Sequence, residues 1–173
     1  MSLNEADTRA QLIDPRLQIA GWSGDKIRRE HYYDRNHRYT DGRIVLRGNN
    51  AKHHEGRKVD YLLRLTSGMP IAVVEAKEEN LSAEVGFEQA KEYAEDLNLP
   101  FAYSTNGHAI IEYDFFTRSS DNVEQFPTPD YLWKRYQLNF GLLEKTRTGT
   151  SEPPAPYVTP GEKDAFRKNP LTH

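Results

Sequence analysis

The stretch VDYLLRLTSGMPIAVVEAK, residues 59–77, decides which fold this chain is expected to adopt. It predicts two β-strands, at residues 59–65 and 71–77, joined by a turn at 66–70 that contains Gly68 and Pro70. The second strand begins with four consecutive apolar residues and is rich in β-branched side chains, which is typical of a strand buried on both faces. We therefore expect this hairpin to lie at the centre of a sheet.

The hairpin brings two acidic residues together if its turn closes with Thr66 opposite Met69. Asp60 then lies opposite Glu75, and residues directly opposed have Cβ atoms about 5 Å apart. Two carboxylates this close repel unless a cation lies between them, and hard oxygen ligands suit Mg²⁺ or Mn²⁺. Lys77 shares a strand face with Glu75, where an ammonium group can hold a water or stabilise charge on a phosphate. The alternative is a structural strand end at which Lys77 simply neutralises Glu75.

A helix is expected to follow at about residues 83–98, ended by Pro100. Its apolar stripe consists of Phe87, Ala90, Ala94 and Leu97. Gln89 and Tyr93 are four residues apart and so share one helical face beside that stripe. They could contact a DNA backbone or the lysine, or they could be half-exposed packing residues.

The remaining elements are weaker predictions. Residues 4–20 favour a helix that Asp14-Pro15 breaks or restarts and that Gly21 ends. Residues 39–46 suggest a turn and a short strand. Residues 101–104 and 108–113 predict two strands around a tight Asn106-Gly107 turn, and residues 129–136 a short helix. The pattern weakens after Asp114.

Composition and charge exclude several classes of protein and of site. The 173 residues contain no cysteine, which rules out disulfides, thiolate nucleophiles and cysteine-ligated metals and suits a cytoplasmic protein. No apolar run approaches the ~20 residues of a membrane helix, and the acidic N-terminus lacks the apolar core of a secretory leader. The net charge is −3, yet residues 26–58 hold ten Lys and Arg against four Asp and Glu. That stretch would suit a phosphate backbone, or would be an ordinary solvated region.

Taken together, these residues resemble a known nuclease family. Asp60, Glu75-Ala76-Lys77 and Gln89 to Tyr93 look like the PD-(D/E)xK motif with the Gln-xxx-Tyr extension of the RecB-like group. The wider pattern, over about residues 4–140, is similar to the N-terminal nuclease domain of type I restriction enzyme R (motor) subunits. The further residues that carry the likeness are Thr8-Arg9, Leu12-Ile13-Asp14-Pro15, Ala20-Gly21-Trp22, Gly56-Arg57-Lys58-Val59 and Thr105-Asn106-Gly107. Val59 stands where the motif has proline, a position that is not a metal ligand.

The resemblance implies an α/β fold with a restriction-endonuclease-like core, in which a central mixed β-sheet is flanked by helices on both faces. It implies that Asp60 and Glu75, helped by the Ala76 backbone carbonyl, ligate Mg²⁺ or Mn²⁺ while Lys77 positions the attacking water. Glu5 is a further candidate for the metal. The residues implied in DNA binding or in support of the site are Gln89, Tyr93, Arg57 and Lys58.

The resemblance also implies partners and a domain organisation. The substrate would be double-stranded DNA, and the modification and specificity subunits of a restriction complex would be partners, with no membrane and no small-molecule cofactor involved. ATP would be used only by a translocase that is absent from this chain. We expect the nuclease domain at residues 1–143 and a Pro-rich linker or tail at 144–173, which holds five Pro and two Gly. Two alternatives stay open: a stand-alone repair or junction-resolving nuclease, and a non-catalytic DNA-binding or docking module of the same fold.

Overall fold

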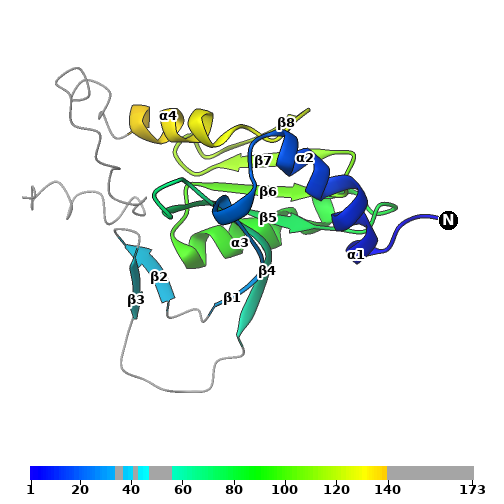
Figure 1. Ribbon diagram of the computed structural model, residues 1–173, viewed down its shortest axis with the longest axis horizontal. Coiled ribbons are helices and arrows are strands. Elements are labelled where there is room, and N and C mark those ends of the chain that lie inside the picture. Colours follow the sequence, from blue (N-terminus) through cyan, green and yellow to red (C-terminus); the bar gives the residue numbers. More distant parts are fainter. Residues whose placement is uncertain (34–36, 41–42, 47–55, 140–173) are drawn as a thin grey trace, which may run out of the picture.

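The computed structural model describes residues 1–33, 37–40, 43–46 and 56–139, with side chains in the first and last of these ranges. Its centre is a six-stranded sheet in the order β1-β4-β5-β6-β7-β8 (Figure 1). The strands are β1 (Ile27–Tyr33), β4 (Arg57–Arg64), β5 (Pro70–Ala76), β6 (Phe101–Thr105), β7 (Ile110–Asp114) and β8 (Ser119–Val123). A separate two-stranded sheet pairs β2 (His37–Thr40) with β3 (Arg43–Leu46).

The sheet is mixed because one helical crossover interrupts a run of antiparallel connections. β5 and β6 pair in parallel, and every other neighbouring pair is antiparallel. The crossover consists of a 3₁₀ turn, η3 (Ala83–Gly86), and the helix α3 (Phe87–Leu97). The mixed sheet of the sequence prediction is therefore confirmed.

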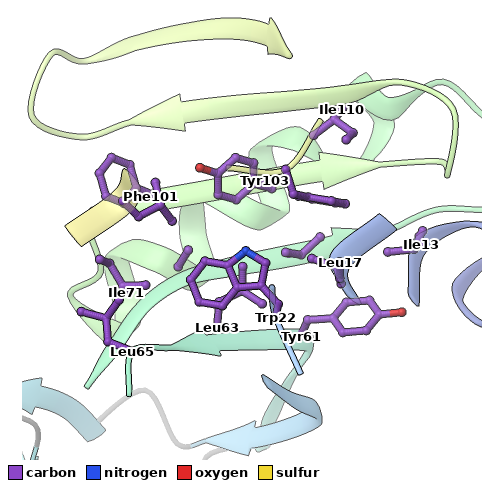
Figure 2. Packing of buried hydrophobic residues seen from close by; sticks show 14 of the residues in the cluster. Ile13, Leu17, Trp22, Tyr61, Leu63, Leu65, Ile71, Phe101, Tyr103 and Ile110 are labelled. Atoms are coloured by element: carbon purple, nitrogen blue, oxygen red, sulfur yellow. The ribbon is translucent and has the colours of Figure 1, made fainter. Parts of the chain in front are cut away.

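Helices cover both faces of this sheet, as expected. On one face lie α1 (Glu5–Thr8), the π-helical turn η1 (Arg9–Ile13), α2 (Asp14–Ile19) and α4 (Pro129–Asn139), whereas α3 packs on the other. Strand residues alternate between the two layers, so that Tyr61 and Leu63 enter the first cluster and Leu62 the second. Figure 2 shows Trp22 in the first cluster beside Leu63.

The N-terminal helical segment is anchored through Trp22. Its indole is 1% exposed, and Nε1 donates to the carbonyl of Pro127 at 2.8 Å. The helix ends where predicted, because Gly21 takes the left-handed φ of +97°. The Trp22 N–H then donates to the carbonyl of Leu17, a bond that closes a helix C-terminus. The long segment from α1 to α2 is thereby held against the sheet.

The hairpin register agrees with the sequence prediction where the site lies and differs at the turn. Tyr61 pairs with Val74 and Leu63 with Ala72, the register that carries on to Asp60 opposite Glu75. The predicted closure with Thr66 opposite Met69 is wrong, because the Leu65 N–H donates to the Met69 carbonyl instead. The register shifts next to Leu63, and the extra residue forms a β-bulge that absorbs the difference.

The structure corrects three further predictions about local structure. The predicted helix at about 83–98 begins as the 3₁₀ turn η3, so the α-helix itself starts only at Phe87. Its end is confirmed to within one residue, since α3 ends at Leu97 and Asn98, with a left-handed φ of +60°, closes it ahead of Pro100. Its stripe includes the buried Tyr93, whereas Phe87 is only partly buried. The Asn106-Gly107 turn is not a tight two-residue hairpin but a longer connection between β6 and β7. There the Asn106 side-chain oxygen accepts the N–H groups of His108 and Ala109, at 3.0 and 2.9 Å.

Residues 39–46 were predicted to hold a turn and one short strand, whereas the structure has the two strands β2 and β3 on either side of positions 41–42. In the six-stranded sheet two strands were not predicted, β1 and β8. Both are outer strands of the sheet, and their residues are mostly exposed or half-buried. They therefore lack the apolar pattern on which recognition of a strand depends. The predicted boundary at 143/144 and the linker at 144–173 lie outside the described residues. Within the described part of the chain, no helix is long and apolar enough to cross a membrane.

Candidate active site

Asp60 and Glu75 lie on neighbouring strands, at the end of the sheet where β5 stops. Each is only 5% exposed. Burial, followed by the negative charge of Asp60, raises the pKa of Glu75 to about 7, although Lys77 acts in the opposite direction. The two acids therefore interact electrostatically, as the register requires. The predicted acid pair is present in the fold.

Lys77 is held directly against this pair. Its Nζ lies 2.8 Å from Oε1 of Glu75 and 3.1 Å from Oε1 of Gln89. Burial opposes the charge on this lysine, but the hydrogen bond and the charge of Glu75 outweigh it and raise the pKa of Lys77 above its usual value. Lys77 is thus a protonated ammonium group whose direction is fixed by Glu75 and Gln89.

The Gln89 and Tyr93 side chains are brought to the lysine by one face of α3. The Gln89 amide accepts from Lys77 and donates its own N–H to the Tyr93 hydroxyl. Tyr93 is 7% exposed and packs edge-on against Tyr33 at a ring distance of 6.0 Å. Of the three readings left open for this face, the observed contacts correspond to the one in which it meets the lysine.

Both oxygens of the Asp60 carboxylate have donors. Oδ2 accepts the backbone N–H of Ala76 at 2.8 Å, and Oδ1 accepts Nη1 of Arg9 at 2.9 Å. Arg9 comes from the N-terminal helical segment, far from Asp60 in the sequence. Sequence reasoning did not assign it a role, because the pairing depends on how that segment packs on the sheet.

Glu5 lies near enough to the acid pair to affect it. Its negative charge contributes to the raised pKa values of both Glu75 and Lys77. It is half-buried on α1. Glu5 thus acts on the site through its charge.

The other two predicted residues are engaged in ion pairs away from the acid pair. Arg57 contacts the carboxylates of Glu92 and Asp96 on α3, at 3.1 and 3.2 Å. Lys58 contacts Glu30 on β1 at 3.2 Å. In this arrangement both side chains tie secondary-structure elements together, and their role in DNA binding or in support of the site stays a prediction.

The donor chemistry at this site fits a hard divalent cation. Asp60 and Glu75 supply carboxylate oxygens, and Mg²⁺ and Mn²⁺ prefer oxygen ligands. A cation between the two carboxylates would relieve the repulsion between their negative charges. Within residues 1–33 and 56–139, no group of three or more Asp, Glu or His side chains is already gathered as a metal site. Water, the Ala76 carbonyl or a substrate oxygen would complete the coordination.

Gly86 covers the site and leaves no room for a side chain. A Cβ at this residue would lie 2.6 Å from Oγ of Ser104, 2.8 Å from Cε of Lys77 and 3.1 Å from Cγ of Glu75. The Ser104 hydroxyl is itself held, since it donates to the Ala83 carbonyl at 2.6 Å. The η3 turn therefore packs directly on the lysine and the glutamate. Sequence reasoning missed Gly86, although a glycine just before a helix that faces the site was a usable signal.

A cavity of about 760 Å³ lies elsewhere, between β7, β8 and α4. Its charged lining includes Glu112 and Asp114, both of which are paired with Arg135 at 2.8 and 2.7 Å. None of the predicted site residues lines it. Both buried acids of the cavity therefore already have Arg135 as a partner.

Comparisons with known proteins point to one family. A family model described as the type I restriction enzyme R protein N terminus (HSDR_N) matches residues 27–127. The type I restriction enzyme EcoAI endonuclease subunit of Escherichia coli is 31% identical over an alignment of 150 residues, and the match covers 83% of this chain and 18% of that protein. A solved fragment assigned as an HsdR subunit of a type I restriction enzyme from Vibrio vulnificus YJ016 has a TM-score of 0.67 and 38% identity. That match covers 100% of this chain and 30% of the solved one.

Raising the pH should destabilise the metal-free chain relative to its Glu75→Gln variant. Because the folded pKa of Glu75, about 7, exceeds its ordinary value of 4.5, the folded state keeps a proton that the unfolded chain releases between these values. The stabilising contribution of this proton is complete below the ordinary pKa of 4.5. It is lost as the pH rises through the folded pKa of about 7. Urea unfolding in EDTA at about pH 5 and about pH 8 measures it.

The Asp60→Asn variant is the companion experiment. It removes the neighbouring negative charge, so the loss of stability should move to lower pH. A stability difference between wild type and Glu75→Gln that stays constant over this pH range would contradict the raised pKa of Glu75. A pH dependence that is the same in Asp60→Asn as in wild type would contradict the interaction between the two acids.

Gly86→Ala should lower the free energy of unfolding by about 1–3 kcal/mol, the usual cost of forcing an extra methyl into a packed region. The reason is the short approach to Ser104 and Lys77. Gly56→Ala is the matched control, because its added Cβ would meet only the Tyr33 carbonyl, at 3.9 Å. Denaturant unfolding of both variants decides the point, and a Gly86→Ala protein as stable as wild type would refute this packing.

Proposed function

Because the chain belongs to the family of type I restriction enzyme R protein N-terminal regions, we propose that it is the metal-dependent endonuclease domain of such a subunit. It spans 18% of the curated relative and 30% of the solved chain, so translocation and assembly are proposed for the larger protein. In that protein the domain would cut double-stranded DNA after an ATP-driven motor has moved along it. The modification and specificity subunits would be its partners.

The contact that supports this proposal most strongly is the one that Lys77 makes with both Glu75 and Gln89. A lysine that served only to neutralise Glu75 would need no second, directed acceptor. Gln89 fixes where the ammonium group points, and Tyr93 in turn holds Gln89. Such a chain of hydrogen bonds is the arrangement that a catalytic group needs if it is to be held in one position.

Asp60 and Glu75 would hold Mg²⁺ or Mn²⁺, with the Ala76 carbonyl as a further ligand. When bound, the ion would act as a Lewis acid on a phosphodiester oxygen and help to form the nucleophile. Glu5, whose charge acts on Glu75, would hold a water of that ion. These roles follow from donor chemistry and position in the fold.

Lys77 would orient the attacking water and stabilise the charge that grows on the phosphate. Its pKa is raised, so it donates hydrogen bonds and does not accept the proton of the water. The water oxygen forms a bond to phosphorus and releases a proton to the solvent, while the bond from phosphorus to the 3′ oxygen breaks. That oxygen takes a proton, so the products carry a 3′-hydroxyl and a 5′-phosphate.

Plasmid cleavage by the full-length R subunit, assembled with its modification and specificity subunits and ATP, tests the proposal. Asp60→Ala and Lys77→Ala should each reduce nicking by about 100-fold or more, because each removes a group that acts on the transition state. ATP hydrolysis should be unchanged. Glu88→Gln is the control on α3, since its exposed side chain contacts only Lys91 among the ion pairs at the described residues.

Nicking that survives either alanine substitution would refute the assignment. The isolated chain, assayed on linear and branched DNA with Mn²⁺, tests the stand-alone nuclease instead. Cleavage there, without partners or ATP, would favour that alternative. DNA binding without cleavage in any assembly would favour the docking module.

A further inference from the structure

Arg9 places a positive charge on one oxygen of the carboxylate that is proposed to hold the metal, Asp60. The other oxygen, Oδ2, is held by the backbone N–H of Ala76 at 2.8 Å. The donor on Oδ1 is a side chain that can move away: Nη1 of Arg9 lies 2.9 Å from this oxygen. The side chains of Arg9 and Asp60 are 19% and 7% exposed, so this ion pair is largely shielded from water.

A divalent cation and this guanidinium cannot share Oδ1 without strong repulsion. Mg²⁺ binds carboxylate oxygens at about 2.0–2.1 Å. A guanidinium nitrogen on the same oxygen would then be within about 5 Å of the ion, where like charges in a poorly hydrated site repel strongly. Binding of the metal at Asp60 therefore requires Arg9 to move.

Arg9 has a second carboxylate within reach. Its Nη2 lies 3.5 Å from Oε1 of Glu30, which is half-exposed and also contacts Lys58. Arg29 pairs with Tyr61, and His31 with Val59, so Glu30 lies beside Asp60 across the strand pair. Glu30 has a left-handed φ of +49°, a backbone conformation that costs energy for a residue with a side chain.

We propose that Arg9 is a built-in counter-ion, which occupies Oδ1 of Asp60 until a divalent cation displaces it toward Glu30. This inference rests on the proposed metal site and adds to it a residue with a defined role. Arg9 acts through Asp60 and is a positioning residue. It keeps the buried carboxylate neutralised in the empty site, and it makes binding of the cation weaker than the two acids alone would allow.

Calorimetric titration of the 173-residue chain with Mn²⁺ tests the proposal. Arg9→Gln should lower the dissociation constant about tenfold, a factor that corresponds to roughly 1.4 kcal/mol. Arg9→Lys keeps the charge and should stay close to wild type. Arg29→Gln is the matched control, because it changes the net charge equally but its partner is Asp14, at 3.2 Å. Arg29→Gln should leave the affinity unchanged.

A second measurement uses the wild-type protein and so does not depend on whether the Arg9→Gln variant is stable. The guanidinium NMR signal of Arg9 in wild type, assigned by its loss in Arg9→Lys, should shift when Mg²⁺ saturates the site. The signal of Arg16 should not shift, because its guanidinium donates to the carbonyls of Gly107 and His108. Circular dichroism verifies that each variant is folded.

The outcomes separate this inference from the proposed function. Equal Mn²⁺ affinities for wild type and Arg9→Gln, with an unmoved Arg9 signal, would overturn the counter-ion and leave the metal site standing. An equal gain in Arg29→Gln would also overturn it, since the effect would then come from net charge. If neither wild type nor Arg9→Gln binds Mn²⁺, the metal site is wrong and the counter-ion is wrong with it.

Discussion

The antiparallel pairing of β4 with β5 is the constraint on which the rest of the site depends. Only one register places Asp60 opposite Glu75, and a slip of one residue would turn one of the two acids to the other face. Burial maintains this register, since successive side chains of both strands enter different apolar clusters. The bulge near the turn isolates the paired positions from the exact shape of the loop.

Placing two like charges in a buried position is unfavourable unless each has partners. In this chain the partners come from different parts of the fold. Arg9 reaches Asp60 from the N-terminal helical segment, whereas Lys77 reaches Glu75 from the residue after β5. Two carboxylates and two cations form a compact cluster of near-neutral charge. The packing of the N-terminal segment, anchored by Trp22, is thereby linked to the electrostatics of the site.

The crossover between β5 and β6 supplies the layer behind this cluster. It contributes Gly86, which approaches the lysine and the glutamate closely, and then Gln89 and Tyr93 from the first turns of α3. The parallel pairing of β5 and β6 puts the start of that crossover at the carboxyl ends of both strands. Open sheets commonly place their functional groups at this edge. A rigid turn over such an edge restricts the directions available to Lys77.

The sequence by itself determined the elements with strong local patterns and the acid pair within them. The hairpin 59–77, the helix of Gln89 and Tyr93 and the left-handed Gly21 all follow from periodicity, turn chemistry and the pleat. Only the tertiary structure decided what depends on contacts between distant segments. The outer strands β1 and β8 are defined by their neighbours, and Arg9 meets Asp60 across 51 residues of sequence. Local patterns carry no information about such pairs, because the side chains are brought together only when the layers pack.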